Sequence, residues 1–345
     1  MNVELKTAWE NLKKENPKLR IRDAAKILSV SEAELLATKI GDSVWLIKND
    51  WAEFLKDTNS LGYVIALTRN EACVHERKGV YENISINGQM GLVVGPDIDL
   101  RIFLNHWKYG FYSEEIRENS ILKSFQFFNT NGEAIHKIYS TTTSDDGGWI
   151  RMKEKYCDNN AQFITPVPQP VETPNENKDD SDDIPNFLQD WSKLEDTHDF
   201  FTLIKKYKFS RYFAVTAASD SFSFKIDTKK FLEIMTASSE KEMEIMIFVG
   251  NPNLIQIHTG QIKRLEPMGP WFNILDPNFN LHLRTDLIYD VWIVDKPTKD
   301  GLVTAIEVFD ENKELILQMF GKRKPGLPQL KEWFELTRKF QTLPL

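Results

Sequence analysis

The chain contains its own sequence twice, and this repeat restricts the fold more than any other feature. Asn70 matches Asn251, an offset of 181 residues, and at that offset the two copies align without a gap over about seventy residues. The shared positions are mostly apolar or turn residues, among them Gly79 with Gly260, Pro96 with Pro277, Leu100 with Leu281, Phe128 with Phe309 and Ile135 with Ile316. Common core and turn positions predict two domains of one fold.

Several unmatched positions between the copies are polar. They include His75 against Gln256, Arg101 against His282, Thr142 against Arg323 and, at an upstream offset of 176, Arg22 against His198. A duplicated fold that keeps its core and varies its polar groups suggests that two scaffolds carry one asymmetric site.

Helical and β-like patterns follow one another in the same order in both copies. In the first copy, helical patterns over residues 2–16 and 22–36 precede short β-like runs over 61–139, and Ser31 is a predicted N-cap. The second copy has helices over 186–210, β-like runs over 211–320 and a closing helix over 327–340. These patterns predict an α+β fold: a tandem structural repeat, each half a large, mainly antiparallel β-sheet flanked by helices.

The stretch from residue 166 to residue 185 separates the copies. It holds five prolines and an acidic run over 179–183, with almost nothing to bury. We therefore expect a first repeat over 1–165, a Pro-rich acidic linker over 166–185, and a second repeat over 186–345.

Composition excludes several classes of protein. A net charge of −8 over 345 residues disfavours broad affinity for nucleic acid or an anionic membrane surface. Cys73 and Cys157 are too few for a disulfide scaffold or a cysteine-based metal site, and they fit a reducing compartment. The N-terminus lacks an apolar signal region, and no apolar run approaches ~18 residues. We expect a cytoplasmic protein with no membrane insertion.

One local pattern, over residues 22–35, resembles the helix-turn-helix of DNA-binding proteins. Its second helix begins Glu32-Ala33-Glu34, and acids at that place oppose phosphate contacts. Two packed helices with a solvated basic face are the favoured interpretation, and a DNA-binding regulator is a distant alternative. The familiar phosphate-loop, dinucleotide, nucleophile-elbow and paired-histidine zinc signatures are missing from the sequence.

His198 is the first candidate for chemistry. Asp196 or Thr197 can cap a helix whose first turn carries the His198 imidazole. A neutral imidazole is a good ligand for iron, and a helix N-terminus helps to keep it unprotonated. Taken alone, however, a histidine in such a place is more often a surface residue, and the local sequence does not decide between these roles.

Taken together, these residues resemble the bacterial cytoplasmic hemin-transport and hemin-degrading family of HemS, ChuS, PhuS and HmuS. The resemblance covers nearly the whole chain. It is carried by Arg69-Asn70, Val74-His75-Glu76, Asp99-Leu100-Arg101, Gln126-Phe127-Phe128, His198-Asp199-Phe200-Phe201, the run from Ile245 to Asn251, and Lys296-Pro297-Thr298-Lys299-Asp300-Gly301. The tandem repeat with a Pro-rich acidic linker is also the layout of that family.

The resemblance implies one haem b (iron protoporphyrin IX), as ligand or substrate, held between the halves with His198 on the iron. It implies a distal, catalytic role for Arg101, which acts with His198, and a secondary haem site at His75. The remaining implied haem-binding residues are Arg211, Phe248, Lys296, Gln318, Phe320 and Arg323. Phe320 departs from the family, which often has Tyr there, and the departure removes a hydroxyl from the pocket.

Two functions of different classes follow from the resemblance. In the first, the chain is a haem-degrading, haem oxygenase-like oxidoreductase of haem uptake and iron acquisition, and an external electron donor supplies the electrons because the sequence has no flavin or nicotinamide motif. In the second, the chain is a non-enzymatic haem carrier that delivers haem to a separate haem oxygenase. The implied partners are haem, a haem ABC importer or a haem oxygenase, and a reductase. Degradation is slightly favoured, and the question of enzyme or carrier stays open.

Overall fold

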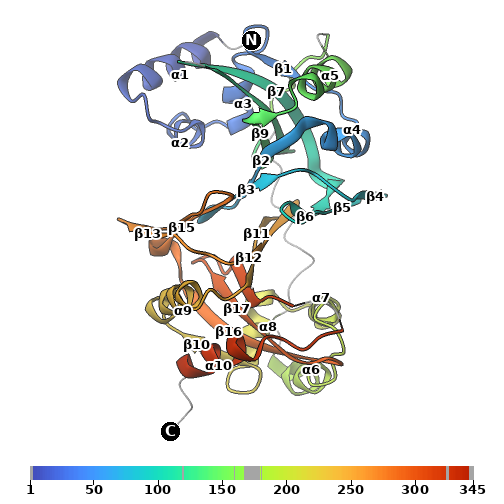
Figure 1. Cartoon of the computed structure of the whole chain (residues 1–345), viewed down its shortest axis with the longest axis vertical. Coiled ribbons are helices and arrows are strands. Elements are labelled where there is room, and N and C mark those ends of the chain that lie inside the picture. The colour runs from blue at the N-terminus through green and yellow to red at the C-terminus, as the bar shows by residue number, and fades with distance from the viewer. Residues whose placement is uncertain are drawn as a thin grey trace. The chain divides into compact units, whose positions relative to one another are not determined.

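The computed structural model describes residues 3–118, 120–158, 160–166, 179, 181–323 and 326–341. It divides into two compact units (Figure 1). Unit 1 comprises Met1–Arg69, Glu76–Pro170 and Gly250–Gln256, and unit 2 comprises Asn70–His75, Val171–Val249 and Ile257–Leu345. Each unit therefore includes a short segment from the other half of the sequence. Most of the predicted linker, residues 167–178 and 180, lies outside the described residues, and the predicted boundaries of the repeats stay a prediction.

Unit 1 is built on an antiparallel run of five strands. Their order is β1 (Val44–Leu46), β7 (Trp107–Arg117), β8 (Ser120–Asn129), β9 (Ala134–Ser144) and β2 (Gly62–Arg69). Unit 1 also contains an antiparallel meander of three strands: β4 (Ile84–Asn87), β5 (Met90–Val94) and β6 (Asp99–Phe103). The helices are α1 (Val3–Glu15), α2 (Ile21–Ile27), α3 (Glu32–Ala37), α4 (Trp51–Asp57) and α5 (Asp146–Tyr156). Strand β3 (Cys73–Gly79) begins in the segment assigned to unit 2.

Unit 2 repeats this plan. Its five-stranded run is β10 (Ser223–Ile226), β16 (Asp290–Thr298), β17 (Gly301–Phe309), β18 (Leu315–Gly321) and β11 (Ile245–Asn251). Its meander is β13 (Leu265–Met268), β14 (Trp271–Leu275) and β15 (Phe279–Arg284), and β12 (Leu254–Gly260) corresponds to β3. The helices are α6 (Ile184–Trp191), α7 (Asp199–Tyr207), α8 (Arg211–Ala217), α9 (Thr228–Glu240) and α10 (Lys331–Phe340).

The strand registers confirm the predicted α+β tandem repeat. Tyr109 pairs with Phe128 across β7 and β8, and Asp290 pairs with Phe309 across β16 and β17, so both partners move by the same offset. The register also shifts at matching places, between Phe127 and Phe128 against β9, and between Val308 and Phe309 against β18. A register that repeats with its irregularity is evidence of one fold built twice.

Parts of the predicted secondary structure are wrong. The β-like runs expected over 211–320 begin later, because α8 and α9 occupy much of 211–240. Short apolar runs do not distinguish a buried helix from a strand. The helical pattern over 22–36 is two helices, α2 and α3, and Ser31 is the N-cap of the second, as predicted.

Helices cover both faces of the five-stranded run in unit 2. Alternate residues of β17 point to opposite faces. Ile306 and Val308 lie in a core with Phe231 of α9 and Trp333 of α10. Ala305 and Phe309 lie in a second core with residues of α6, α7 and α8. Glu307 alternates with the first pair, so the polar site described below lies on the face covered by α6–α8.

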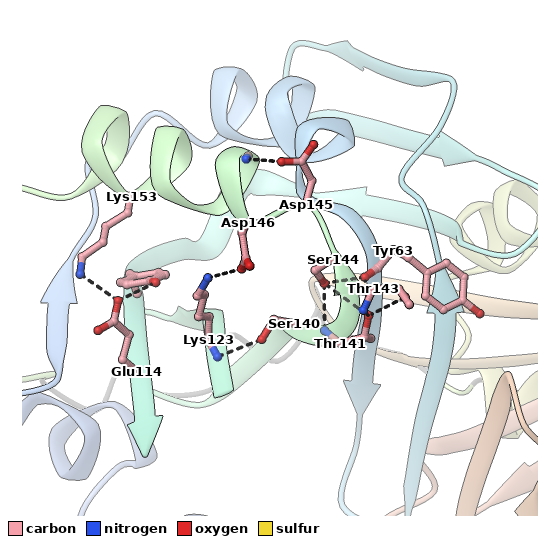
Figure 2. Close-up of polar contacts among 12 residues, drawn as sticks. Tyr63, Glu114, Lys123, Ser140, Thr141, Thr143, Ser144, Asp145, Asp146 and Lys153 are labelled. Carbon is pink, nitrogen blue, oxygen red and sulfur yellow. Dashed lines mark hydrogen bonds and ion pairs between the residues drawn. The ribbon is translucent and has the colours of Figure 1, made fainter. Parts of the chain in front are cut away.

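Side-chain contacts fix the connection from β9 to α5 in unit 1 (Figure 2). The Asp145 carboxylate accepts a hydrogen bond from the Gly148 N–H at 2.7 Å and so caps α5. A Cβ at Gly148 would meet the Ser60 carbonyl oxygen at 1.7 Å, so only glycine fits there. The Ser144 hydroxyl donates to the Tyr63 carbonyl at 2.6 Å. Among the described residues, no helix is long and apolar enough to span a membrane.

Candidate functional site

His198 stands at the start of α7, in unit 2, and its side chain is 91% exposed. Its Nδ1 lies 2.6 Å from Oδ1 of Asp196, and the same oxygen accepts the His198 backbone N–H at 2.9 Å. This backbone hydrogen bond is the largest of the causes that hold the pKa of Asp196 below its ordinary value. A carboxylate on Nδ1 favours the tautomer that leaves the Nε2 lone pair open, which is how metal-binding histidines are oriented.

The predicted cap of this helix is wrong in detail. His198 itself occupies the N-cap position, and neither Asp196 nor Thr197 does. Asp196 instead accepts the backbone N–H of His198 and lies within hydrogen-bond distance of its ring Nδ1. The backbone N–H of Lys299 donates to the Glu195 carbonyl at 3.0 Å and so fastens this segment to the turn between β16 and β17.

The second part of the site is a carboxylate that receives four hydrogen bonds. Glu307, in β17, is fully buried. Its Oε2 accepts from Nε of Arg211 at 2.7 Å, and its Oε1 accepts from Nη2 of Arg211 at 2.7 Å. The same Oε1 accepts from Nζ of Lys296 at 2.8 Å and from Nε2 of Gln318 at 2.9 Å. We call Arg211, Lys296, Glu307 and Gln318 the Glu307 cluster. Three predicted site residues are thus brought together by a fourth that the sequence analysis missed.

The charges of the Glu307 cluster stabilise one another. Burial alone would raise the pKa of Glu307, but Arg211 and then Lys296 oppose it and hold that pKa well below its ordinary value. The pKa of Lys296 is lowered, chiefly by burial, although Glu307 acts to raise it. Charge-assisted hydrogen bonds of this kind are about twice as strong as neutral ones.

Aromatic rings border the Glu307 cluster. Nζ of Lys296 lies 4.5 Å from the ring centre of Phe200 and 6.0 Å from that of Phe320, and the Arg211 guanidinium lies 5.3 Å from Phe200. The rings of Phe320 and Phe248 are 5.2 Å apart and edge to face. Phe200 belongs to the first turn of α7, so the cluster is connected to the helix that begins at His198.

Arg323 follows β18 and acts electrostatically on Asp196, the partner of His198. Its Nη1 is buried and makes no hydrogen bond within the part of the chain that the structure describes. A buried guanidinium nitrogen without an acceptor is costly. A ligand with an acceptor oxygen at this place would satisfy a protein donor.

Two predicted residues lie elsewhere. Arg101 is in β6 of unit 1, where its guanidinium donates to the Asp99 carboxylate. Burial raises the pKa of Asp99. His75 is in the short segment of unit 2 that begins β3, and its ring is fully buried, with its centre 5.0 Å from that of Phe279. The roles of Arg101 and His75 stay predictions.

Comparison with known proteins gives a consistent result. The model of the haemin-degrading HemS/ChuX domain matches twice, over residues 29–156 and 208–340. The hemin transport protein HmuS of Yersinia pestis is 35% identical, and the match covers 97% of this chain and 96% of HmuS. The solved structure of holo-PhuS, a heme-binding protein from Pseudomonas aeruginosa, is 41% identical with a TM-score of 0.95 and covers 99% of both chains. ChuS, an E. coli heme oxygenase, is 30% identical with a TM-score of 0.87 over 98% of this chain and 99% of ChuS.

Proposed function

We propose, from the premise that this chain belongs to the family of haemin-degrading HemS/ChuX proteins, that it binds haem through unit 2 and serves haem uptake and iron acquisition. The observation that carries the proposal is the exposure of His198 and its contact with Asp196. Its imidazole is exposed, and Asp196 occupies Nδ1, so Nε2 is available as an iron ligand.

The other residues of unit 2 fit the rest of a haem. The protoporphyrin IX of haem b carries two carboxylates on a flat apolar ring. Arg211, Lys296 and Gln318 supply donors for one carboxylate, and the buried Nη1 of Arg323 supplies a donor for another acceptor. Phe248 and Phe320 offer apolar surface, and Phe320 does so without the hydroxyl that a Tyr would add.

We favour haem degradation with electrons from an external donor, in the cytoplasm. A bound haem supplies the iron at which oxygen chemistry occurs. In this proposal His198 would hold the iron, and the Arg101 guanidinium would stabilise negative charge and position ordered water, which would supply the protons. ChuS, named a heme oxygenase, supports this choice. PhuS, named a heme-binding protein, supports the second candidate, a carrier that hands haem to a separate haem oxygenase.

His198→Ala tests the binding proposal. It should abolish the Soret spectrum of the coordinated complex or weaken hemin binding at least ~10-fold, since the variant removes the ligand to iron. His282→Ala is the matched control, because His282 belongs to the same unit and hydrogen bonds Asn273 at 2.7 Å. Hemin titrations followed by absorbance decide the question, and an unchanged titration of the His198 variant rejects the ligand assignment.

The hemin complex, given a physiological electron donor with catalase present, separates the enzyme from the carrier. Stoichiometric tetrapyrrole product and iron support degradation, and intact haem supports carriage. Arg101→Ala should then slow ring cleavage more than it weakens binding, because its role is assigned to the reaction rather than to affinity. Equal cleavage rates in variant and wild type would remove Arg101 from the mechanism.

A further inference from the structure

Glu307 is the one member of the Glu307 cluster whose charge opposes a carboxylate ligand. It is fully buried in the middle of β17, and its four hydrogen bonds come from three other elements: α8, β16 and β18. A buried carboxylate side chain in a site that has to attract a carboxylate ligand needs a physical explanation.

The first reason is orientation. Glu307 receives two parallel hydrogen bonds from Arg211, both at 2.7 Å, and this bidentate geometry fixes the plane of the guanidinium. The Arg211 side chain is 27% exposed, and neither of these bonds uses its Nη1. The bonds from Lys296 and Gln318 reach the same carboxylate.

The second reason is the charge of Lys296. The Lys296 side chain is only 3% exposed, and the charged groups that act on it are Glu307, which favours the ammonium, and Arg211, which opposes it. A buried lysine without a carboxylate partner readily loses its proton near neutral pH. Two cations and one anion leave the Glu307 cluster with a single positive charge, which matches a single carboxylate.

We propose that Glu307 is a positioning residue of a carboxylate-binding site: it orients Arg211 and holds Lys296 as an ammonium, so that the Glu307 cluster offers one net positive charge to one carboxylate of the ligand. This inference rests on the proposed function of unit 2 in haem binding. It assigns Glu307 a role that a neutral residue of the same shape cannot fill.

The first measurement uses the protein without hemin. In Glu307→Gln the pKa of Lys296 should fall further below its ordinary value, so the unfolded chain binds a proton that the folded chain does not. Stability then rises with pH between about pH 6 and about pH 9, by up to about tenfold per pH unit in the unfolding equilibrium constant. Adding Lys296→Met should remove this slope. Glu335→Gln, which breaks an exposed pair with Lys331, is the control and should keep the pH dependence of wild type.

The second measurement compares hemin with hemin dimethyl ester, which lacks both carboxylates. Wild type should prefer hemin. Glu307→Gln should weaken hemin binding by about 10-fold and leave the ester within about 2-fold, because only the carboxylate contact is damaged. If Glu307 were only an opposing charge, the variant would bind hemin more tightly.

The outcomes separate the two claims. A pH slope that depends on Lys296, together with a lost preference for hemin, supports the inference. Tighter hemin binding by Glu307→Gln, or the lack of a slope, overturns it. Wild type that binds hemin and the ester equally overturns the inference and leaves haem binding intact, whereas wild type that binds neither overturns the proposed function itself. If Glu307→Gln does not fold, Lys296→Met tests the net charge of the Glu307 cluster: it should lose the preference for hemin and keep ester binding, and a kept preference overturns the inference.

Discussion

Each half of the chain buries a carboxylate against cations, but the two halves place opposite charges at the same position. A serine caps the matching helix in both, Ser31 before α3 and Ser210 before α8. The next residue is Glu32 in the first half and Arg211 in the second. Glu32 forms ion pairs with Arg69 and Lys137 of the sheet, whereas Arg211 pairs with Glu307 of the sheet.

The strand positions show the same reversal. At the offset of 181 residues, Lys137 corresponds to Gln318, and Glu307 corresponds to Gln126. Both halves keep an ion pair between helix and sheet. The helix carries the anion in the first half and the cation in the second. Only in the second half does the helix contribute a cation to it, with the Arg211 side chain 27% exposed against 5% for Glu32. The difference teaches that a duplicated core can keep a buried ion pair while changing the sign of the charge that the helix presents.

The largest expected effect comes from breaking the ion pair of the first half. Glu32→Gln removes the carboxylate that pairs with the buried ammonium of Lys137 and with the Arg69 guanidinium. Removing one partner of a buried pair typically costs about 3–5 kcal/mol. Denaturant unfolding should show this loss, with hemin affinity unchanged. Loss of less than about 1 kcal/mol would mean that the pair does not support the first half.

A charge exchange sharpens the comparison. Glu32→Arg alone should be as harmful as Glu32→Gln or worse, since it adds a cation beside Lys137. Combining it with Gln126→Glu and Lys137→Gln copies the ion pair between helix and sheet of the second half and should recover part of the stability. Coupling in such a cycle commonly reaches about 0.5–3 kcal/mol. A triple variant no more stable than Glu32→Arg would show that the two scaffolds are not equivalent at these positions.

A second difference between the halves is a series of buried side-chain hydrogen bonds in the first half. Nδ1 of His136 lies 2.9 Å from the Thr68 hydroxyl, and Nε2 lies 2.6 Å from the Tyr81 hydroxyl, with all three residues buried. The corresponding residues of the second half are apolar: Val249, Leu317 and Ile262. Burial lowers the pKa of His136 to about 3 and raises that of Tyr81.

Acid should therefore destabilise the first half through His136. Because the folded pKa is below the ordinary value of 6.5, the unfolded chain takes up the proton first. The stability is present above about pH 6.5 and is lost as the pH falls toward about 3, by at most about 1.4 kcal/mol per pH unit. The triple variant Thr68→Val, Tyr81→Phe, His136→Leu removes this titration without leaving an unpaired group. The unfolding free energy of wild type minus that of the variant should fall from neutral to acid pH across this range, and a constant difference would contradict the assignment.

The sequence predicted the repeat well because core and turn positions recur at a fixed offset, and strand registers follow from them. The Ser31 cap was also predictable, since its signal is local. Glu307 was not, because its partners come from elements as far as 96 residues away along the chain. One signal was present: a charged residue within the apolar run from Ala305 to Phe309, where the first copy has only a neutral Gln126. The assignment of His198 needed the family resemblance, since an exposed histidine before a helix has no distinctive local pattern.

The smallest expected effect separates the two serine caps. The Ser31 hydroxyl accepts from the Glu34 N–H, and the Glu34 carboxylate accepts from the Ser31 N–H at 2.8 Å. These two reciprocal hydrogen bonds form a capping box at the start of α3. In α8 the third position is Phe213, which cannot return a bond, and the Ser210 N–H donates instead to Asp179 at 2.9 Å.

Each serine-to-alanine variant should cost about 1 kcal/mol in denaturant unfolding, because each removes one cap acceptor. Asp179→Ala should cost at most a few tenths of a kcal/mol, since its contact is exposed. Ser210→Ala carries a further consequence that Ser31→Ala does not, because Arg211 follows it directly. A frayed first turn of α8 should weaken hemin binding by a few fold, while Ser31→Ala leaves it unchanged. Equal hemin affinities in the two alanine variants would show that the position of Arg211 is set by Glu307 alone and not by the helix that carries it.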